Sequence, residues 1–209
     1  FIIIAVDNVM IISMNSVLQT YGGPGEGDML ITCATIVQSF MLVITMPLGG
    51  ITGGTQTILA FNYGAGQPDR VKKAQRFIFF LSAGYTTILF ILAQTAGHIF
   101  VRLFTSDPAL IAEAAKTIKI YTLAVIPLSI QYVIVDGFTG LGKVQLSLPL
   151  SFFRKLVYFL PLFLLPRFFG ARATFYADPI SDIIAPVVSI FIYAVAMKRI
   201  LKKPVIPNF

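Results

Sequence analysis

Two aspartates that lie in apolar stretches are the residues best suited to chemistry in this chain. Asp7 lies within the apolar residues 1–20, and Asp136 lies near the end of the apolar residues 117–138. A carboxylate inside a bilayer costs on the order of 3 kcal/mol unless it is protonated, paired or hydrated, and such residues usually serve a function. Two carboxylates from different helices that face one cavity can share a proton or hold one Na⁺. The residues alone leave open which ion is used. They equally allow Asp7 at the membrane surface and Asp136 as a cap or a partner of Lys143.

Methionines and uncharged polar residues accompany these aspartates on helical faces. Met10 and Met14 follow Asp7 at i+3 and i+7, which places all three on one face of a helix. Flexible thioether side chains suit apolar ligands of varied shape, and plain packing against helices or lipid explains them equally well. Gln38 and Gln56 fit a bridging role between helices. The uncharged polar candidates for the wall of a substrate cavity are Asn15, Gln38 and Gln131.

The composition indicates a membrane protein. Of the 209 residues, 56% are hydrophobic and only 12% are charged, and the mean hydropathy is +0.84. A soluble domain carries about 25% charged residues. The net charge of +7 lies in short clusters between apolar runs, without the long basic stripe that nucleic-acid binding would favour. One cysteine (Cys33) and one histidine (His98) rule out a disulfide framework within the chain and a zinc or catalytic cluster built on His or Cys.

Six apolar segments approach the roughly 20 residues that cross a bilayer core. We therefore expect an all-α bundle of six transmembrane helices, forming a single unit over residues 1–209. The second segment is too long for one straight span, and Pro47 with several nearby glycines predicts a kink there. Residues 98–116 are expected to form a short interfacial helix in a loop. The expected spanning helices are residues 1–20, 29–61, 77–97, 117–138, 144–165 and 179–197.

Lysine and arginine collect unequally on the two sides of this arrangement. Nine lie on one side and five on the other, when Arg154 and Lys155 inside the fifth span are left out. The positive-inside rule predicts that the side with nine faces the cytoplasm. Both ends of this segment then lie in the cytoplasm, in a multi-pass protein of the plasma or inner membrane. The nine are Arg70, Lys72, Lys73, Arg76, Lys143, Lys198, Arg199, Lys202 and Lys203.

The remaining charges have simple expected roles, and no catalytic motif accompanies them. Arg154 and Lys155 are expected to snorkel to a cytoplasmic cavity, with an anion or a lipid headgroup as the alternative contact. Asp178 and Asp182 are expected to cap the last helix. The Gly-Ala-Gly turn at residues 64–66 lacks the Lys and Ser or Thr of a phosphate-binding loop. We therefore predict that the chain is not an enzyme and needs no organic cofactor.

Several motifs, in order along the chain, resemble one transporter family. Residues 47–56 read P-L-G-G-I-T-G-G-T-Q, residues 61–66 read F-N-Y-G-A-G, and residues 70–74 read R-V-K-K-A. Together these resemble the second-half signature of the MATE (multidrug and toxic compound extrusion) transporters. Further matches resemble the ends of that family's seventh and tenth helices, its eleventh helix and the start of its twelfth. These are residues 18–23, 136–143, 153–155 and 179–182.

This resemblance covers essentially the whole chain and implies the C-terminal six-helix lobe of a twelve-helix transporter. Its partners would be the N-terminal lobe, the lipid bilayer and small-molecule drugs or toxins. The family's activity implies export of amphipathic or cationic compounds in exchange for H⁺ or Na⁺. The coupling ion would bind at Asp7 and at the pair Tyr132 and Asp136, and Na⁺ there would be the only metal. The family usually carries Glu where this chain has Asp7, so the carboxylate is one methylene shorter here. The alternatives are a lipid or lipid-linked oligosaccharide flippase of the same superfamily and a half-protein without transport activity.

Overall fold

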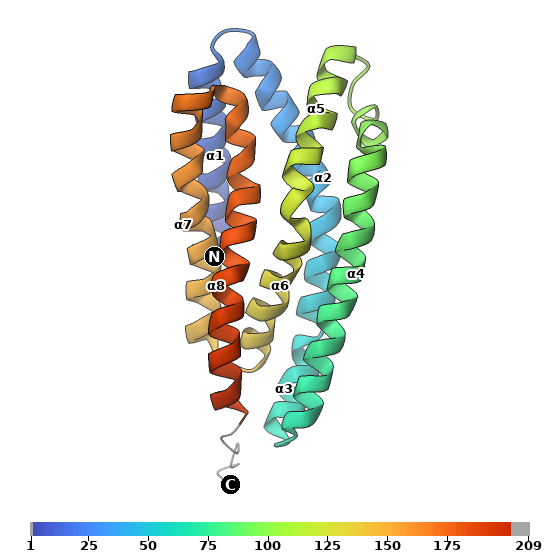
Figure 1. Ribbon diagram of the computed structural model, residues 1–209, viewed down its shortest axis with the longest axis vertical. Coiled ribbons are helices and arrows are strands. Elements are labelled where there is room, and N and C mark those ends of the chain that lie inside the picture. Colours follow the sequence, from blue (N-terminus) through green and yellow to red (C-terminus); the bar gives the residue numbers. More distant parts are fainter. Residues whose placement is uncertain (1, 202–209) are drawn as a thin grey trace.

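The protein is a bundle of long helices that run side by side, with turns at both ends (Figure 1). The computed structural model describes residues 2–201, and all regular secondary structure in that range is helical. α2 and α3 together make one long span, as do α5 and α6, so the predicted all-α bundle of six spanning segments is confirmed. The elements are α1 (Ile2–Gly22), α2 (Glu26–Gly54), α3 (Gln56–Gly64), α4 (Pro68–Val101), α5 (Pro108–Tyr121), η1 (Thr122–Ala124), α6 (Val125–Gly140), α7 (Val144–Phe169), η2 (Ala171–Tyr176) and α8 (Ala177–Ile200).

The length and the surface of these helices fit a lipid environment. Five stretches of the described chain are long and apolar enough to cross a membrane, and α1 adds a further long helix of 21 residues. Large apolar side chains are exposed on the outside of the bundle, which is unfavourable in water but favourable in contact with lipid. The chain is therefore a multi-pass membrane protein. Examples of these exposed side chains are Phe61, Phe77, Leu160 and Phe191.

The second span is interrupted at Thr55, and not at Pro47. Pro47 lies within the continuous helix α2. Two glycines, which are poor helix formers, directly precede Thr55. The Thr55 hydroxyl donates to the carbonyls of Ile51 at 3.1 Å and of Thr52 at 2.8 Å. Such side-chain bonds compete with the backbone pattern of a helix. The break therefore directly follows Gly53 and Gly54, the last glycines of the stretch in which the sequence predicts a kink.

Residues 98–116 do not form an interfacial helix in a loop, so that expectation is wrong. α4 continues to Val101, and α5 then begins at Pro108 and runs into the bundle. Asp107 caps α5, because its Oδ1 accepts a hydrogen bond from the backbone N–H of Ala109 at 2.9 Å. α5, η1 and α6 together form one candidate span, Pro108–Gly140.

The short 3₁₀ turn η1 between α5 and α6 has a local cause. Pro127 has no N–H and cannot bond to the carbonyl of Leu123, four residues earlier. The chain leaves the α-helical pattern at that turn and resumes it in α6. Because the charged α5 and the apolar α6 join end to end, this span begins nine residues earlier than the apolar stretch at 117–138 indicates.

α4 also begins earlier than its apolar stretch, at Pro68 and not near residue 77. Proline suits the first turn of a helix, where its missing N–H is not needed. Only one face of the early turns is buried, at Val71, Gln75 and Ile78, while Lys72 stays exposed. The basic residues that were expected in a loop therefore extend the helix beyond its apolar part.

Small residues on α6 allow α3 and α4 to approach it closely. A Cβ atom added at Gly137 would lie 2.5 Å from Gln75 Nε2, and one added at Gly140 would lie 3.0 Å from the backbone of Gln56. One added at Gly50 in α2 would meet nothing within 4 Å. Glycines at such contacts let helix backbones come together in membranes, so Gly137 and Gly140 fix how α3 and α4 sit against α6.

The two ends of the bundle differ in charge, as the sequence predicts. The α3–α4 turn, the α6–α7 turn and the end of α8 lie together at the lower end in Figure 1. There Lys143 Nζ lies 5.5 Å from the centroid of the Tyr63 ring. The described members of the larger basic group lie at this end or on the adjoining turns of α4 and α8. Lys202 and Lys203 lie outside the described residues, as does Phe1.

Candidate functional site

Two cavities that share part of their walls contain most of the predicted site residues. The methionine cavity has a volume of about 310 Å³, and its wall includes Met10, Met14, Gln38 and Tyr121. The ion-pair cavity has a volume of about 200 Å³, and its wall includes Gln131, Asp136, Ser151 and Lys155. Three residues line both cavities: Asp7, Tyr132 and Arg154.

The structure therefore brings Asp7 and Asp136 to one cavity, from α1 and α6 respectively. Tyr132 of α6 also lines this cavity. Asn15 lines neither of these two cavities, although it is on α1. Asp7 lies in the second turn of α1, and α1 begins part-way along the bundle (Figure 1). That position is the one in which an intramembrane carboxylate needs a partner or an ion.

Asp136 is held by two donors on either side of the break at Thr55. Thr52 Oγ1 on α2 donates to Asp136 Oδ2 at 2.5 Å, and Gln56 Nε2 on α3 donates to Asp136 Oδ1 at 3.0 Å. The break thus turns one donor from each helix toward the same carboxylate. Gln56 bridges helices, as expected, whereas the alternative that pairs Asp136 with Lys143 is wrong, because Lys143 lies over a tyrosine ring at the end of the bundle.

Asp7 forms an ion pair with Lys155 of α7, which the sequence analysis did not anticipate. Lys155 Nζ contacts Asp7 Oδ1. The lysine side chain is only 4% exposed, whereas the aspartate side chain is 49% exposed. Snorkelling to a cytoplasmic cavity was the expectation for Lys155, and its side chain lines the ion-pair cavity inside the bundle. The signal that could have found the pair was a cation and an anion that each lie inside an apolar stretch, since such groups usually pair in membranes.

Arg154, the preceding residue on α7, forms a second internal ion pair. Successive residues on a helix are about 100° apart, so Arg154 faces α8 while Lys155 faces α1. Arg154 Nη1 lies 3.0 Å from Asp182 Oδ1, and the Asp182 side chain is 2% exposed. Arg154, for which the same expectation was made, lines both the methionine cavity and the ion-pair cavity. Capping is wrong for Asp182, whereas Asp178 does lie in the first turn of α8.

Two predicted cavity residues are tied into the bundle by hydrogen bonds. The sulfur of Met14 accepts from Gln38 Nε2 at 3.7 Å and from the Tyr121 hydroxyl at 3.3 Å. Met14 is consequently held in one place, with a side chain only 1% exposed. Gln131 joins α6 to α7 and α8 in a similar way. Its Nε2 donates to the Leu150 carbonyl at 3.2 Å, and its Oε1 accepts from Ser189 Oγ at 2.5 Å.

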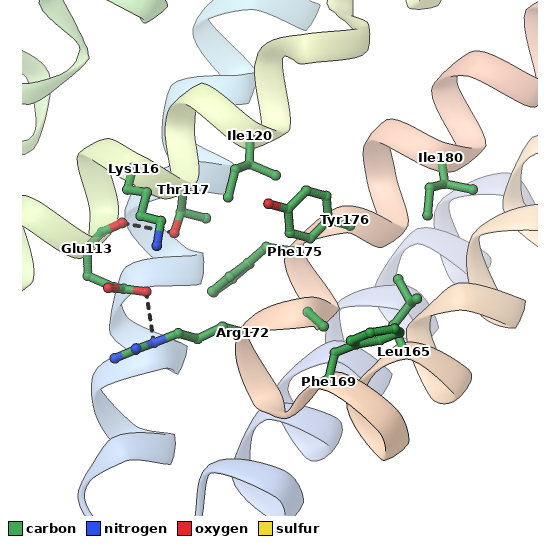
Figure 2. Close-up of a pocket in the computed structure, with 11 residues that line it drawn as sticks. Glu113, Lys116, Thr117, Ile120, Leu165, Phe169, Arg172, Phe175, Tyr176 and Ile180 are labelled. Carbon is green, nitrogen blue, oxygen red and sulfur yellow. Dashed lines mark hydrogen bonds and ion pairs between the residues drawn. The ribbon is translucent and has the colours of Figure 1, made fainter.

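A third cavity, of about 430 Å³, lies near η2, between α5, α7 and α8 (Figure 2). Its wall is mainly apolar and aromatic, with residues such as Leu165, Phe169, Phe175 and Tyr176. At its edge, Arg172 Nε lies 3.1 Å from Glu113 Oε1, and Arg172 Nη2 lies 3.4 Å from Glu26 Oε1. No pattern in the sequence indicates this cavity, because its residues come from separate segments with no shared periodicity.

Comparison with known proteins agrees with this architecture. The family model MatE matches residues 4–164. No curated protein matches the chain. Similar solved structures include an inward-facing multidrug resistance MATE family transporter of the MOP superfamily, with a TM-score of 0.82 and 15% identity over 93% of this chain and 45% of that chain. They also include an outward-facing one, with a TM-score of 0.86 and 15% identity over 95% of this chain and 44% of that chain.

A mutant of the Vibrio cholerae MATE transporter VcmN is similar as well, with a TM-score of 0.84 and 16% identity over 94% of this chain and 44% of that chain. Identities this low show the common fold alone. The chain spans less than half the length of each of these solved transporters. The family model covers well over half of the chain itself, with the motifs around the break at Thr55 inside the matched range. The chain therefore belongs to the MatE family, the MATE multidrug transporters.

Proposed function

We propose that this chain is the C-terminal six-helix lobe of a secondary active antiporter, which exports amphipathic or cationic drugs and toxic compounds in exchange for H⁺ or Na⁺. The observation that carries the proposal is that Asp7 lines both the methionine cavity and the ion-pair cavity. A change of ion at Asp7 therefore changes the charge in the wall of the adjoining methionine cavity. Such a shared wall is a direct way to couple an ion to a larger substrate.

The proposed mechanism is alternating access with competition at the shared wall. The coupling ion binds at Asp7 and Asp136, with Tyr132 beside them. A cationic substrate in the methionine cavity would compete for the charge of Asp7, while Met10 and the other apolar side chains contact its body. The carboxylate of Asp7 then compensates either the coupling ion or the cationic substrate, but not both at once. Release of the coupling ion on one side of the membrane and of the substrate on the other side would move the two in opposite directions.

The N-terminal lobe and the bilayer are the proposed partners, and the basic end of the bundle is proposed to face the cytoplasm. Asp7 is 49% exposed in this chain. A second lobe packed against the α1 side would enclose that carboxylate in a central cavity. A plasma or inner membrane is the proposed location.

A lipid-linked oligosaccharide flippase is the less favoured function. Recognition of its phosphates calls for several cavity-lining cations that are available to the cargo. Arg154 and Lys155 line the ion-pair cavity, yet each is engaged by a carboxylate, Asp182 and Asp7 respectively. The cations in this wall are thus already compensated from within the chain.

The test uses the gene that encodes this chain, with its native flanking sequence, in a drug-hypersensitive bacterial host. We expect Asp7→Asn to lower resistance to a cationic dye such as ethidium to the level of an empty vector, at equal protein abundance. Asp7→Glu should retain part of the resistance, because it keeps the carboxylate. Asp69→Asn, which removes an exposed charge from the pair with Lys72, is the matched control. Wild-type resistance in Asp7→Asn would contradict the proposed function.

A further inference from the structure

The pair formed by Asp7 and Lys155 places a cation of the protein itself on the carboxylate proposed to bind the coupling ion. This inference rests on the proposed function, because it concerns which ion the Asp7 site accepts. The two partners are held differently. Lys155 is 4% exposed and Asp7 is 49% exposed, so the ammonium group is enclosed by the bundle while the carboxylate is open to the cavities.

Burial makes this ammonium group hard to displace. A charge taken out of water is costly unless an opposite charge compensates it. A sodium ion that took Asp7 for itself would leave Lys155 enclosed with less compensation. It would therefore have to supply both its own dehydration energy and the energy of separating the pair. A tethered ammonium group also competes without any loss of translational entropy on binding.

Asp136, the second carboxylate of the ion-pair cavity, does not change the competition between Lys155 and Na⁺ for Asp7. Two carboxylates, Asp7 and Asp136, line the cavity together with two cations, Arg154 and Lys155. Asp136 is already held by Thr52 and Gln56 through its two oxygens. The formal charges of these four residues cancel, and Arg154 is in addition paired with Asp182, which lies outside this lining. Without the lysine, the same wall would carry a net negative charge beside Asp7, which is the condition that favours an alkali cation.

We infer that Lys155 determines the ion specificity of this site: its ammonium group occupies Asp7 as a resident cation and excludes Na⁺ from the ion-pair cavity. The pair can still exchange protons, because a proton can be added to the carboxylate or lost from the ammonium group without any ion entering the cavity. Lys155 is thus a specificity-determining residue that acts on the ion through Asp7. Na⁺ dependence should appear only when that charge is removed.

The experiment measures ²²Na⁺ binding to the purified transporter that contains this chain, in detergent, with choline replacing Na⁺ as the reference. We expect no saturable binding to the wild type in the millimolar range. Lys155→Met keeps a long apolar stem without the charge, and it should bind Na⁺ at least about tenfold more tightly than the wild type, since a unit charge in contact is removed. Lys155→Arg keeps the charge and should behave as the wild type. Lys72→Met, which removes a lysine from an exposed pair, is the matched control.

The double variant Asp7→Asn/Lys155→Met should lose the binding that Lys155→Met gains, which places the bound ion at Asp7. Unchanged Na⁺ binding in a monodisperse Lys155→Met protein would overturn the inference. So would millimolar Na⁺ binding to the wild type that Asp7→Asn abolishes, a result that needs no Lys155 variant to fold. Because the readout is binding, it is separate from dye export. If dye export does not depend on Asp7 while Na⁺ binding follows these expectations, the proposed function is wrong. If dye export depends on Asp7 but Na⁺ binding does not change in Lys155→Met, only the role of Lys155 is wrong.

Discussion

Loss of the internal Arg154–Asp182 pair should destabilise the protein far more than loss of a surface pair. Asp182 is 2% exposed and Arg154 is 20% exposed, with 3.0 Å between Nη1 and Oδ1. Asp182→Asn keeps the size of the side chain and one hydrogen-bond acceptor, but it leaves the guanidinium group without its counter-charge. Removal of one partner from a buried pair costs about 3–5 kcal/mol. Asparagine keeps one acceptor and the arginine is partly exposed, so the expected loss in the free energy of unfolding is smaller than that range but still at least about 2 kcal/mol.

The assay is the free energy of unfolding of the purified transporter, from denaturant titration in mild detergent. Asp69→Asn serves as the control, because it removes the same charge from the Lys72–Asp69 pair, whose side chains are 93% and 61% exposed for Asp69 and Lys72. We expect that control to match the wild type. The double variant Arg154→Gln/Asp182→Asn should recover at least half of the loss, since no uncompensated charge remains. Equal stability of Asp182→Asn and Asp69→Asn would refute the internal ion pair.

Two further predictions concern packing and the third cavity. Gly140→Ala should lower the free energy of unfolding by about 1–3 kcal/mol, because the added Cβ would meet the backbone of Gln56 at 3.0 Å, while Gly50→Ala should have little effect; equal stability of the two variants would contradict the contact between α3 and α6. Arg172→Met should change the free energy of unfolding by less than about 1 kcal/mol despite the loss of the contact with Glu113, since Arg172 is 54% exposed; a loss as large as that of Asp182→Asn would contradict this assignment.

The bundle itself was predictable because one physical requirement dominates it. A span must be apolar over the thickness of the bilayer, and backbone polar groups must be satisfied within the segment. Apolar runs therefore predicted six long segments, of which the described chain shows five candidate spans and the further long helix α1. A segment that neighbouring helices shield from lipid need not be apolar, so apolar runs do not show the full length of such a span. α5 carries charged residues yet forms the first half of the span Pro108–Gly140, and its buried positions, such as Ala114 and Ile118, face the core of the bundle.

The candidate site was predictable only as far as one helix determines it. The spacing along α1 places Asp7, Met10 and Met14 on one face, and the structure puts all three in the wall of the methionine cavity. Contacts between helices depend on packing that no local pattern contains. The hydrogen bonds from Thr52 and Gln56 to Asp136 are of this kind. The roles of Asp7 and Asp136 in binding an ion stay a prediction.

The internal charges show the same limit in another form. Arg154 and Lys155 could be recognised as unusual within an apolar stretch, but consecutive residues on a helix face different neighbours. Only the packing of α7 against both α1 and α8 shows that Lys155 meets Asp7 and that Arg154 meets Asp182. Without that arrangement, snorkelling to a cytoplasmic cavity was the simplest expectation for both cations.

Transport in proteoliposomes tests the central claim most directly. The purified transporter that contains this chain would be reconstituted, and efflux of a cationic dye would be followed after a proton gradient or a Na⁺ gradient is imposed separately. The antiport account predicts dye movement against the direction of the imposed ion flux, and its loss in Asp7→Asn. The role inferred for Lys155 further predicts that the proton gradient alone is effective in the wild type. Dye movement that neither gradient changes would contradict the account.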